Sequence, residues 1–169
     1  MPLDLASGLP FALALRIGIA AATILTAPRR RVARRVGFLG SAAASLATGL
    51  AAVQVLRSGT PVSGVLFTHH ESGFSLGYSI DGLSAWFLLV LAVVAIPIAI
   101  FSLGYVGGPH WSRRSVFLGV TFNVLLGAVE LVFVAGDLVT FLCAWELMTL
   151  ATAALVATEH EARASRRAA

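Results

Sequence analysis

The chain has 169 residues, of which 58% are hydrophobic and only 12% are charged. A soluble domain carries about a quarter charged residues, so this composition excludes an ordinary water-soluble globule and predicts an integral membrane protein. The net charge of +4 comes from arginines that stand mainly between apolar runs. That placement favours a topological role over nucleic-acid binding. The single cysteine, Cys143, excludes an intrachain disulfide framework and any multi-cysteine metal site.

Five apolar runs predict an all-α, polytopic membrane protein with five spanning helices. They cover about residues 9–27, 36–56, 83–106, 115–135 and 138–157. Each is close to the roughly 20 residues that cross a hydrocarbon layer of about 30 Å. Helices satisfy every backbone polar group without water, so each run is expected to span as a helix. We interpret residues 1–169 as one membrane domain, with an outer loop at 57–81 and a cytoplasmic tail at 158–169.

The arginines predict that the N-terminus lies outside the cell membrane and the C-terminus in the cytoplasm. The first run follows "MPLDLASGLP", which contains Asp4 and no basic residue, unlike the start of a signal peptide. The segment "RRRVARR" comes directly after that run. Five alternating helices then place Arg113, Arg114 and the tail arginines on the same side as this cluster, which satisfies the positive-inside rule.

Small residues recur every fourth position along the second run, at Gly37, Ser41, Ser45 and Gly49. Such a face lets helix backbones approach closely in lipid. We expect it to pack against the chain's own helices, with contact to a partner subunit as the alternative.

The polar loop before the third run predicts a short β-hairpin. The segments "VSGVLF" and "FSLGYSI" alternate in the manner of strands around "THHESG". His69 and His70 are adjacent and would point to opposite faces of a strand, so we expect no shared metal site. No other pattern in the sequence indicates a metal or a cofactor.

Three charged residues fall within the apolar runs: Arg16, Glu130 and Glu146. A charge at the bilayer centre costs roughly 2.5–3.5 kcal/mol, so each one needs a partner, a water-filled cavity or a neutralising proton. We expect Arg16 to pair with one of the glutamates, and Glu130 either to form that pair or to reach interfacial water. Glu146, about 12 Å from its helix end, lies near the midplane. It is therefore the candidate proton-handling residue, with Glu130 and Arg16 as candidate contributors.

Catalytic machinery is absent from the sequence. It contains no glycine-rich phosphate loop, no histidine pair at helical spacing and no nucleophile with a base nearby. Asp81 and Asp137 precede the third and fifth runs, where we expect capping or positioning roles. Trp145, beside Glu146, is also assigned a structural role.

Two segments carry a family resemblance: "SIDGLSAWFLLVL" at 79–91 and "FLCAWELMTLATAALV" at 141–156. The chain resembles the antiporter-like membrane subunits of respiratory complex I and of membrane-bound hydrogenases. The matching features are Asp81–Ser84, Gly136–Asp137 and Trp145–Met148. The sequence around Glu146, with the "ATEHE" that follows, is most similar to hydrogenase-4 component B and the formate hydrogenlyase membrane subunit. A complex I or multisubunit sodium/proton antiporter subunit is the alternative.

The resemblance implies proton translocation, with sodium as an alternative ion, driven by redox chemistry on neighbouring subunits. It implies membrane subunits of a hydrogenase or complex I-like assembly as partners. In the family, the residue matching Glu146 faces a lysine on a broken seventh helix, but this chain contains five runs and no lysine. We therefore expect the N-terminal portion of such a subunit, present as a fragment, a split subunit or a small complete protein. The competing hypotheses are a non-conducting membrane scaffold and an independent oligomeric transporter.

Overall fold

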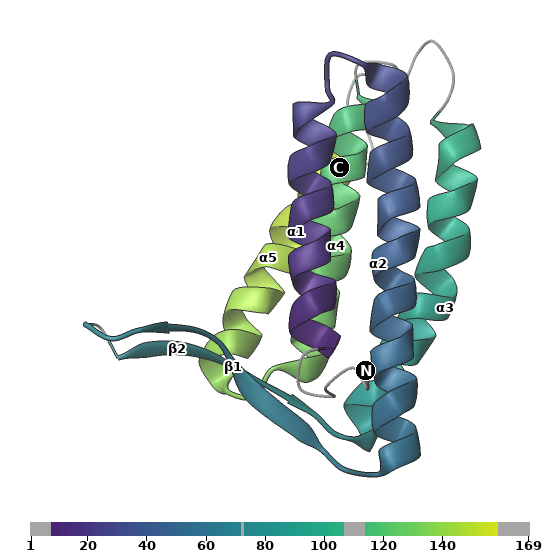
Figure 1. Ribbon diagram of the computed structural model, residues 1–169. Coiled ribbons are helices and arrows are strands. Elements are labelled where there is room, and N and C mark those ends of the chain that lie inside the picture. The colour runs from purple at the N-terminus through teal and green to yellow at the C-terminus, as the bar shows by residue number, and fades with distance from the viewer. Residues whose placement is uncertain (1–7, 72, 107–113, 159–169) are drawn as a thin grey trace.

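The computed structural model describes residues 8–71, 73–106 and 114–158 and contains five helices and one hairpin within them (Figure 1). All five helices are long and apolar enough to cross a membrane, so the predicted polytopic helical fold is confirmed. The expected tail beyond residue 158, and Arg113, lie outside the described residues. The elements are α1 (Gly8–Leu25), α2 (Arg30–Ser58), β1 (Val62–His69), β2 (Phe74–Ile80), α3 (Gly82–Tyr105), α4 (Ser115–Val134) and α5 (Leu138–Ala157).

The helices form a bundle in which successive helices run in opposite directions (Figure 1). Helix α2 packs against α1, α3 and α4, whereas α5 lies at the edge and packs mainly against α4 and β2. One end of the bundle holds the α1–α2 turn and the start of α4, with Arg29, Arg30 and Arg114; we call it the arginine end. The hairpin emerges at the opposite end, which we call the hairpin end.

Helix α2 is longer than the apolar run that predicted it, because it begins at Arg30 rather than near residue 36. Arginine is a good helix former, and its long side chain carries the charge away from the apolar stem, so a basic cluster extends the helix at low cost. Arg34 uses this reach to donate a hydrogen bond to the Val106 carbonyl at 3.3 Å. At its other end the helix is closed by Gly59, whose φ of 66° is left-handed.

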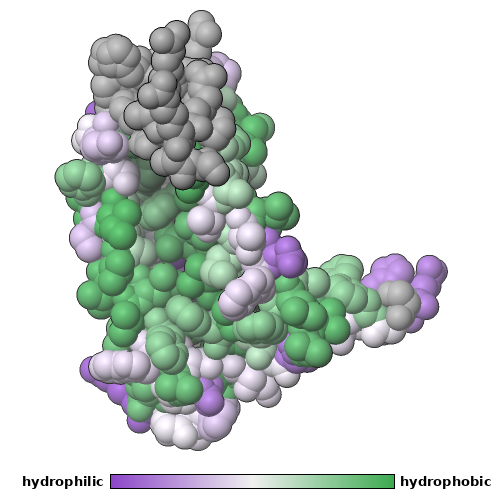
Figure 2. All heavy atoms as spheres, turned by 180° about the vertical axis from the view of Figure 1, so that it is seen from behind, coloured by the Kyte–Doolittle hydropathy of each residue, from purple (hydrophilic) through white to green (hydrophobic). Residues whose placement is uncertain are grey.

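The predicted β-hairpin is confirmed. Strand β1 pairs antiparallel with β2, with Phe67 opposite Leu76 and His69 opposite Phe74. The hairpin extends sideways from the bundle past α5, and hydrophilic residues gather at its tip (Figures 1 and 2). Both histidines are exposed, and no cluster of three metal-binding side chains occurs among the described residues.

The small-residue face of α2 packs inside the bundle, as expected for internal packing. Gly37, Ser41, Ser45 and Gly49 are all buried. A Cβ placed on Gly37 would lie 3.2 Å from the Cα of Gly119 on α4. Helices α2 and α4 therefore cross with their backbones in near contact.

Candidate functional site

A buried ion pair joins α1 to α4 in the interior of the bundle. The Arg16 guanidinium donates from Nε to Glu130 Oε2 at 2.8 Å and from Nη2 to Glu130 Oε1 at 2.6 Å. Arg16 is 3% exposed and Glu130 is 0% exposed. This two-pronged geometry is the strongest arrangement available to an arginine and a carboxylate.

Two hydroxyl groups from α2 add hydrogen bonds to the ion pair. Thr48 Oγ1 donates to Glu130 Oε1 at 2.6 Å, and Ser45 Oγ accepts from Arg16 Nη2 at 3.0 Å. A buried charge pair is better tolerated when further groups use its remaining hydrogen-bonding capacity. The polar residues of α2 therefore make this pair possible, and they tie three helices together at one point.

The structure identifies the partner of Arg16, which the sequence left open between two glutamates. Of the two alternatives expected for Glu130, the structure shows the pair with Arg16 and not contact with interfacial water, because both carboxylate oxygens bind protein groups and the residue is fully buried. Counting residues from the helix end gives depth but not direction around the helix axis. The signal that could have indicated the inward direction was the pair of hydroxyl residues, Ser45 and Thr48, on the facing helix.

Glu146 lies in a very different environment, on the exposed side of α5. It follows Leu138 by eight residues, which places it about 12 Å along a helix of 20 residues. The buried residues of α5 are only Thr140, Ala144 and Ala151, all on the opposite side. Within the described part of the chain, the Glu146 carboxylate accepts no hydrogen bond from another side chain and forms no ion pair.

The structure thus separates the two glutamates that the sequence grouped as membrane charges. Glu130 is satisfied inside α1, α2 and α4, whereas Glu146 is presented outward with Trp145, which is 48% exposed. Trp145 packs at a tilt against Phe141, with ring centroids 5.6 Å apart. The exposed surface of α3 is also apolar but contains no charged residue. Within the described helices only α5 places a carboxylate on its outer face, which is mostly apolar apart from the exposed Thr149 and Thr152.

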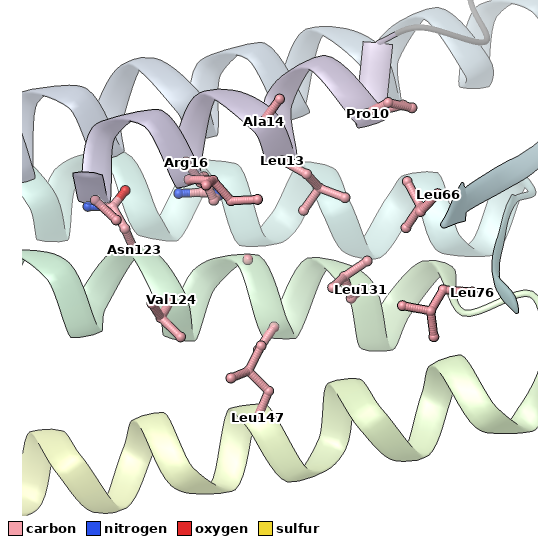
Figure 3. Close-up of a pocket in the computed structure, with 14 residues that line it drawn as sticks. Pro10, Leu13, Ala14, Arg16, Leu66, Leu76, Asn123, Val124, Leu131 and Leu147 are labelled. Atoms are coloured by element: carbon pink, nitrogen blue, oxygen red, sulfur yellow. The ribbon is translucent and has the colours of Figure 1, made fainter. Parts of the chain in front are cut away.

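An apolar pocket of about 510 Å³ lies between α1 and α4, with hairpin residues at one end (Figure 3). Leu147 of α5 faces it from the side. Two polar residues reach the pocket, Arg16 and Asn123, and the oxygen of Asn123 is turned toward Arg16 (Figure 3). Asn123 is 1% exposed, and its side-chain amide donates to the carbonyls of Gly37 and Gly119 at 2.9 and 2.8 Å.

Asp137 caps α5 and also holds the hairpin against it. Its Oδ1 accepts from the Thr140 backbone N–H at 2.8 Å, and its Oδ2 accepts from the Thr140 hydroxyl at 2.8 Å and the Gly77 N–H at 2.9 Å. Gly136 adds a backbone hydrogen bond to Gly77. Asp81 caps α3 in the same way, accepting from the Ser84 N–H at 2.7 Å, but it has no such bond to the hairpin strands in the described structure.

Hydrogen bonds from the Thr140 backbone N–H, then from its hydroxyl and from Gly77, lower the pKa of Asp137 below its ordinary value of 3.8. The bond from the Ser84 backbone N–H likewise lowers the pKa of Asp81. Because the folded-state pKa values are depressed, these caps stabilise the fold above pH 3.8. That stabilisation is lost as the pH falls through the folded-state values.

We expect Asp137→Ala to loosen the hairpin, because the Gly77 N–H then loses its carboxylate partner and α5 loses its cap. The Gly77 amide should lose protection against hydrogen exchange in the variant. When both proteins are compared at the same pH, the protection in the wild type should approach that in the variant as the Asp137 carboxylate becomes protonated in acid. Asp81→Ala is the matched control, since it removes a cap of the same geometry elsewhere. Equal protection of Gly77 in both variants would contradict the anchoring role.

Comparison with known proteins connects part of this architecture to a family. Residues 67–114 match the family model described as NADH-Ubiquinone oxidoreductase (complex I), chain 5 N-terminus. This segment runs from β1 through α3 to the start of α4. The match supports the coarser form of the resemblance, an antiporter-like membrane subunit of the complex I type, and with the five apolar helices it supports a multi-pass membrane location.

Two uncharacterized proteins of Mycobacterium tuberculosis, from strains CDC 1551 / Oshkosh and ATCC 25618 / H37Rv, are also similar to the chain. Each is 37% identical to it over 81 residues. The similar region covers 48% of this chain and 12% of each relative, so the chain spans a small part of the length of the curated proteins that it matches.

Proposed function

We propose that this chain forms the N-terminal part of a proton-translocating, antiporter-like membrane subunit in a hydrogenase-4 or complex I-like oxidoreductase complex. In this proposal Glu146 takes up and releases the proton, and redox chemistry takes place on other subunits. The observation that carries the proposal is the outward placement of Glu146 at the middle of α5, on a mostly apolar face whose other polar groups are threonine hydroxyls. The family match over residues 67–114 supplies the context.

A carboxylate exposed to lipid is energetically unfavourable. A central charge costs roughly 2.5–3.5 kcal/mol, and α5 offers Glu146 no compensating group among the described residues. A protein segment that covers α5 and brings a cation or hydrogen-bond donor would remove this cost. The family resemblance implies a lysine on a later helix. This chain contains no lysine, so that group would belong to a segment outside this sequence.

The proposal also assigns an orientation and partners. The arginine end faces the cytoplasm, and the hairpin end faces outward, in agreement with the positive-inside rule. The neighbours of the α5 face are membrane segments of the same assembly. The inward-facing pair of Arg16 and Glu130 then has a supporting role, because its charges already satisfy each other.

Glu146→Gln tests the proposal, because glutamine keeps the size of the side chain and removes its titration. We expect proton pumping per assembled complex, measured by acidification of inverted membrane vesicles, to fall to the background seen with an uncoupler. Glu71→Gln is the matched control, since it removes an exposed carboxylate from the hairpin turn. Pumping should then be unchanged.

The same experiment separates pumping from scaffolding. If Glu146→Gln lowers only the amount of assembled complex and leaves pumping per complex intact, the proton-handling role is wrong. The chain would then be a non-conducting structural subunit. Proton flux through the purified chain alone in liposomes would instead favour an independent transporter.

A further inference from the structure

Three buried polar atoms in the core of the bundle have no hydrogen-bond partner in the described structure. They are Arg16 Nη1, Ser41 Oγ and Asn123 Oδ1. A fourth, Arg34 Nε, lies near the arginine end and belongs to a different region. A buried polar group without a hydrogen-bond partner destabilises the fold, so three on neighbouring residues of the core suggest a bound molecule that would pair with them.

The contacts of these residues place the three atoms around one region between α1, α2 and α4. On α2, residues four apart share one face. Asn123 is bound to the carbonyl of Gly37 on that face, and Arg16 is bound to the hydroxyl of Ser45. Ser41 lies midway between these two positions. Its hydroxyl therefore lies on the α2 face between the residue that the Asn123 amide binds and the residue that Arg16 binds.

We propose that this region is a water-binding site. Arg16 Nη1 is a donor, Asn123 Oδ1 is an acceptor, and the Ser41 hydroxyl can act as either, so water complements all three. Buried waters make about three hydrogen bonds to groups that are otherwise unsatisfied. The pocket of about 510 Å³ is lined by Arg16 and Asn123, so free volume lies beside two of the three residues (Figure 3).

The charges around the site exclude ionic occupants. A cation would face the guanidinium N–H of Arg16, and an anion would face the Asn123 oxygen with the Glu130 carboxylate close by. Arg16 and Glu130 neutralise each other, so a neutral molecule leaves the charge balance unchanged. With water bound, a series of hydrogen bonds leads from Glu130 through Arg16 and the water to Asn123. Glu130 and Asn123 are about 10 Å apart along α4. The water site does not involve Glu146 and does not depend on the proposed pumping function.

Asn123 offers a direct readout, because it is the only asparagine in the sequence. Asparagine-selective ¹⁵N labelling of the full chain in lipid bilayers gives one side-chain amide signal. Water-edited solid-state NMR then measures magnetisation transfer from water to that amide. We expect rapid transfer in the wild type and a severalfold slower build-up in Ser41→Val, where the added methyl groups displace the water.

Ser102→Val is the matched control, since Ser102 is a partly exposed residue on α3 whose hydroxyl donates to the Ile98 carbonyl. It should leave the Asn123 signal and its build-up unchanged. If Ser41→Val does not fold, Ser41→Ala removes one of the three partners without adding bulk and should slow the build-up less. Absence of transfer in the wild type, or equal transfer in the wild type and the folded Ser41 variant, would overturn the proposal.

Discussion

Glu130→Ala is expected to lower the free energy of unfolding by about 3–5 kcal/mol, because it leaves the Arg16 guanidinium charged, buried and unpaired. The variant also removes the acceptor of the Thr48 hydroxyl. Thermal or denaturant-induced unfolding in mixed micelles, followed by helical circular dichroism, measures the change. A loss below about 1 kcal/mol would contradict a desolvated pair, since that value is typical of a surface ion pair.

The double variant Arg16→Met, Glu130→Met separates the loss of the pair from the burial of one charge. Replacing a buried ion pair with apolar side chains of similar size is often neutral or stabilising. We therefore expect the double variant to be more stable than Glu130→Ala, although it carries more substitutions. Comparable losses in the two variants would mean that the pair itself, rather than an orphaned charge, supplies the stability.

Gly37→Ala is the second substitution with a large expected effect, at about 1–3 kcal/mol of destabilisation. Its new Cβ would lie 3.2 Å from the backbone Cα of Gly119 and 3.3 Å from the Thr23 hydroxyl, so α2 and α4 must separate by a few tenths of an ångström. The hydrogen bond from Asn123 to the Gly37 carbonyl would stretch as they do. Unfolding in mixed micelles, with the Asn123 amide shift as a local probe, would detect both changes.

Gly18→Ala is the control for the change in helix propensity. Gly18 lies on α1, and no atom stands within 4 Å of the place that an alanine methyl group would take there, so the substitution meets open space. We expect the stability to be unchanged or slightly raised, because alanine favours helix over glycine. Equal losses at both glycines would show that backbone effects, not the close crossing, account for the result.

Hydropathy predicted the helices well, because crossing a membrane sets a minimum length and forbids unsatisfied backbone groups. It could not predict which face of each helix turns inward, since lipid-facing and core-facing sides are both apolar in a bundle of this kind. Glu130 and Glu146 illustrate the limit: both interrupt apolar runs, and only packing makes one internal and the other external. The start of α2 was misplaced because arginines are compatible with a helix that extends beyond the apolar layer.

The candidate site was partly accessible from sequence for the same reasons. The charged residues stand out against the hydrophobic background, so Arg16, Glu130 and Glu146 could be selected by position alone. Asn123 was missed, because a single amide within an apolar run has no obvious partner in the sequence. Its importance depends on Gly37, whose missing side chain lets the amide reach a carbonyl on another helix.

The way α5 is held has a consequence for any neighbour that binds its outer face. At the hairpin end, Asp137 and Gly136 fix the start of the helix to Gly77; at the arginine end, Arg114 donates to the Thr158 carbonyl at 2.7 Å. Both ends are therefore fixed before a partner arrives. Binding to Glu146 would not incur the entropic cost of ordering the helix, so α5 is a preorganised surface on which modest contacts suffice for association.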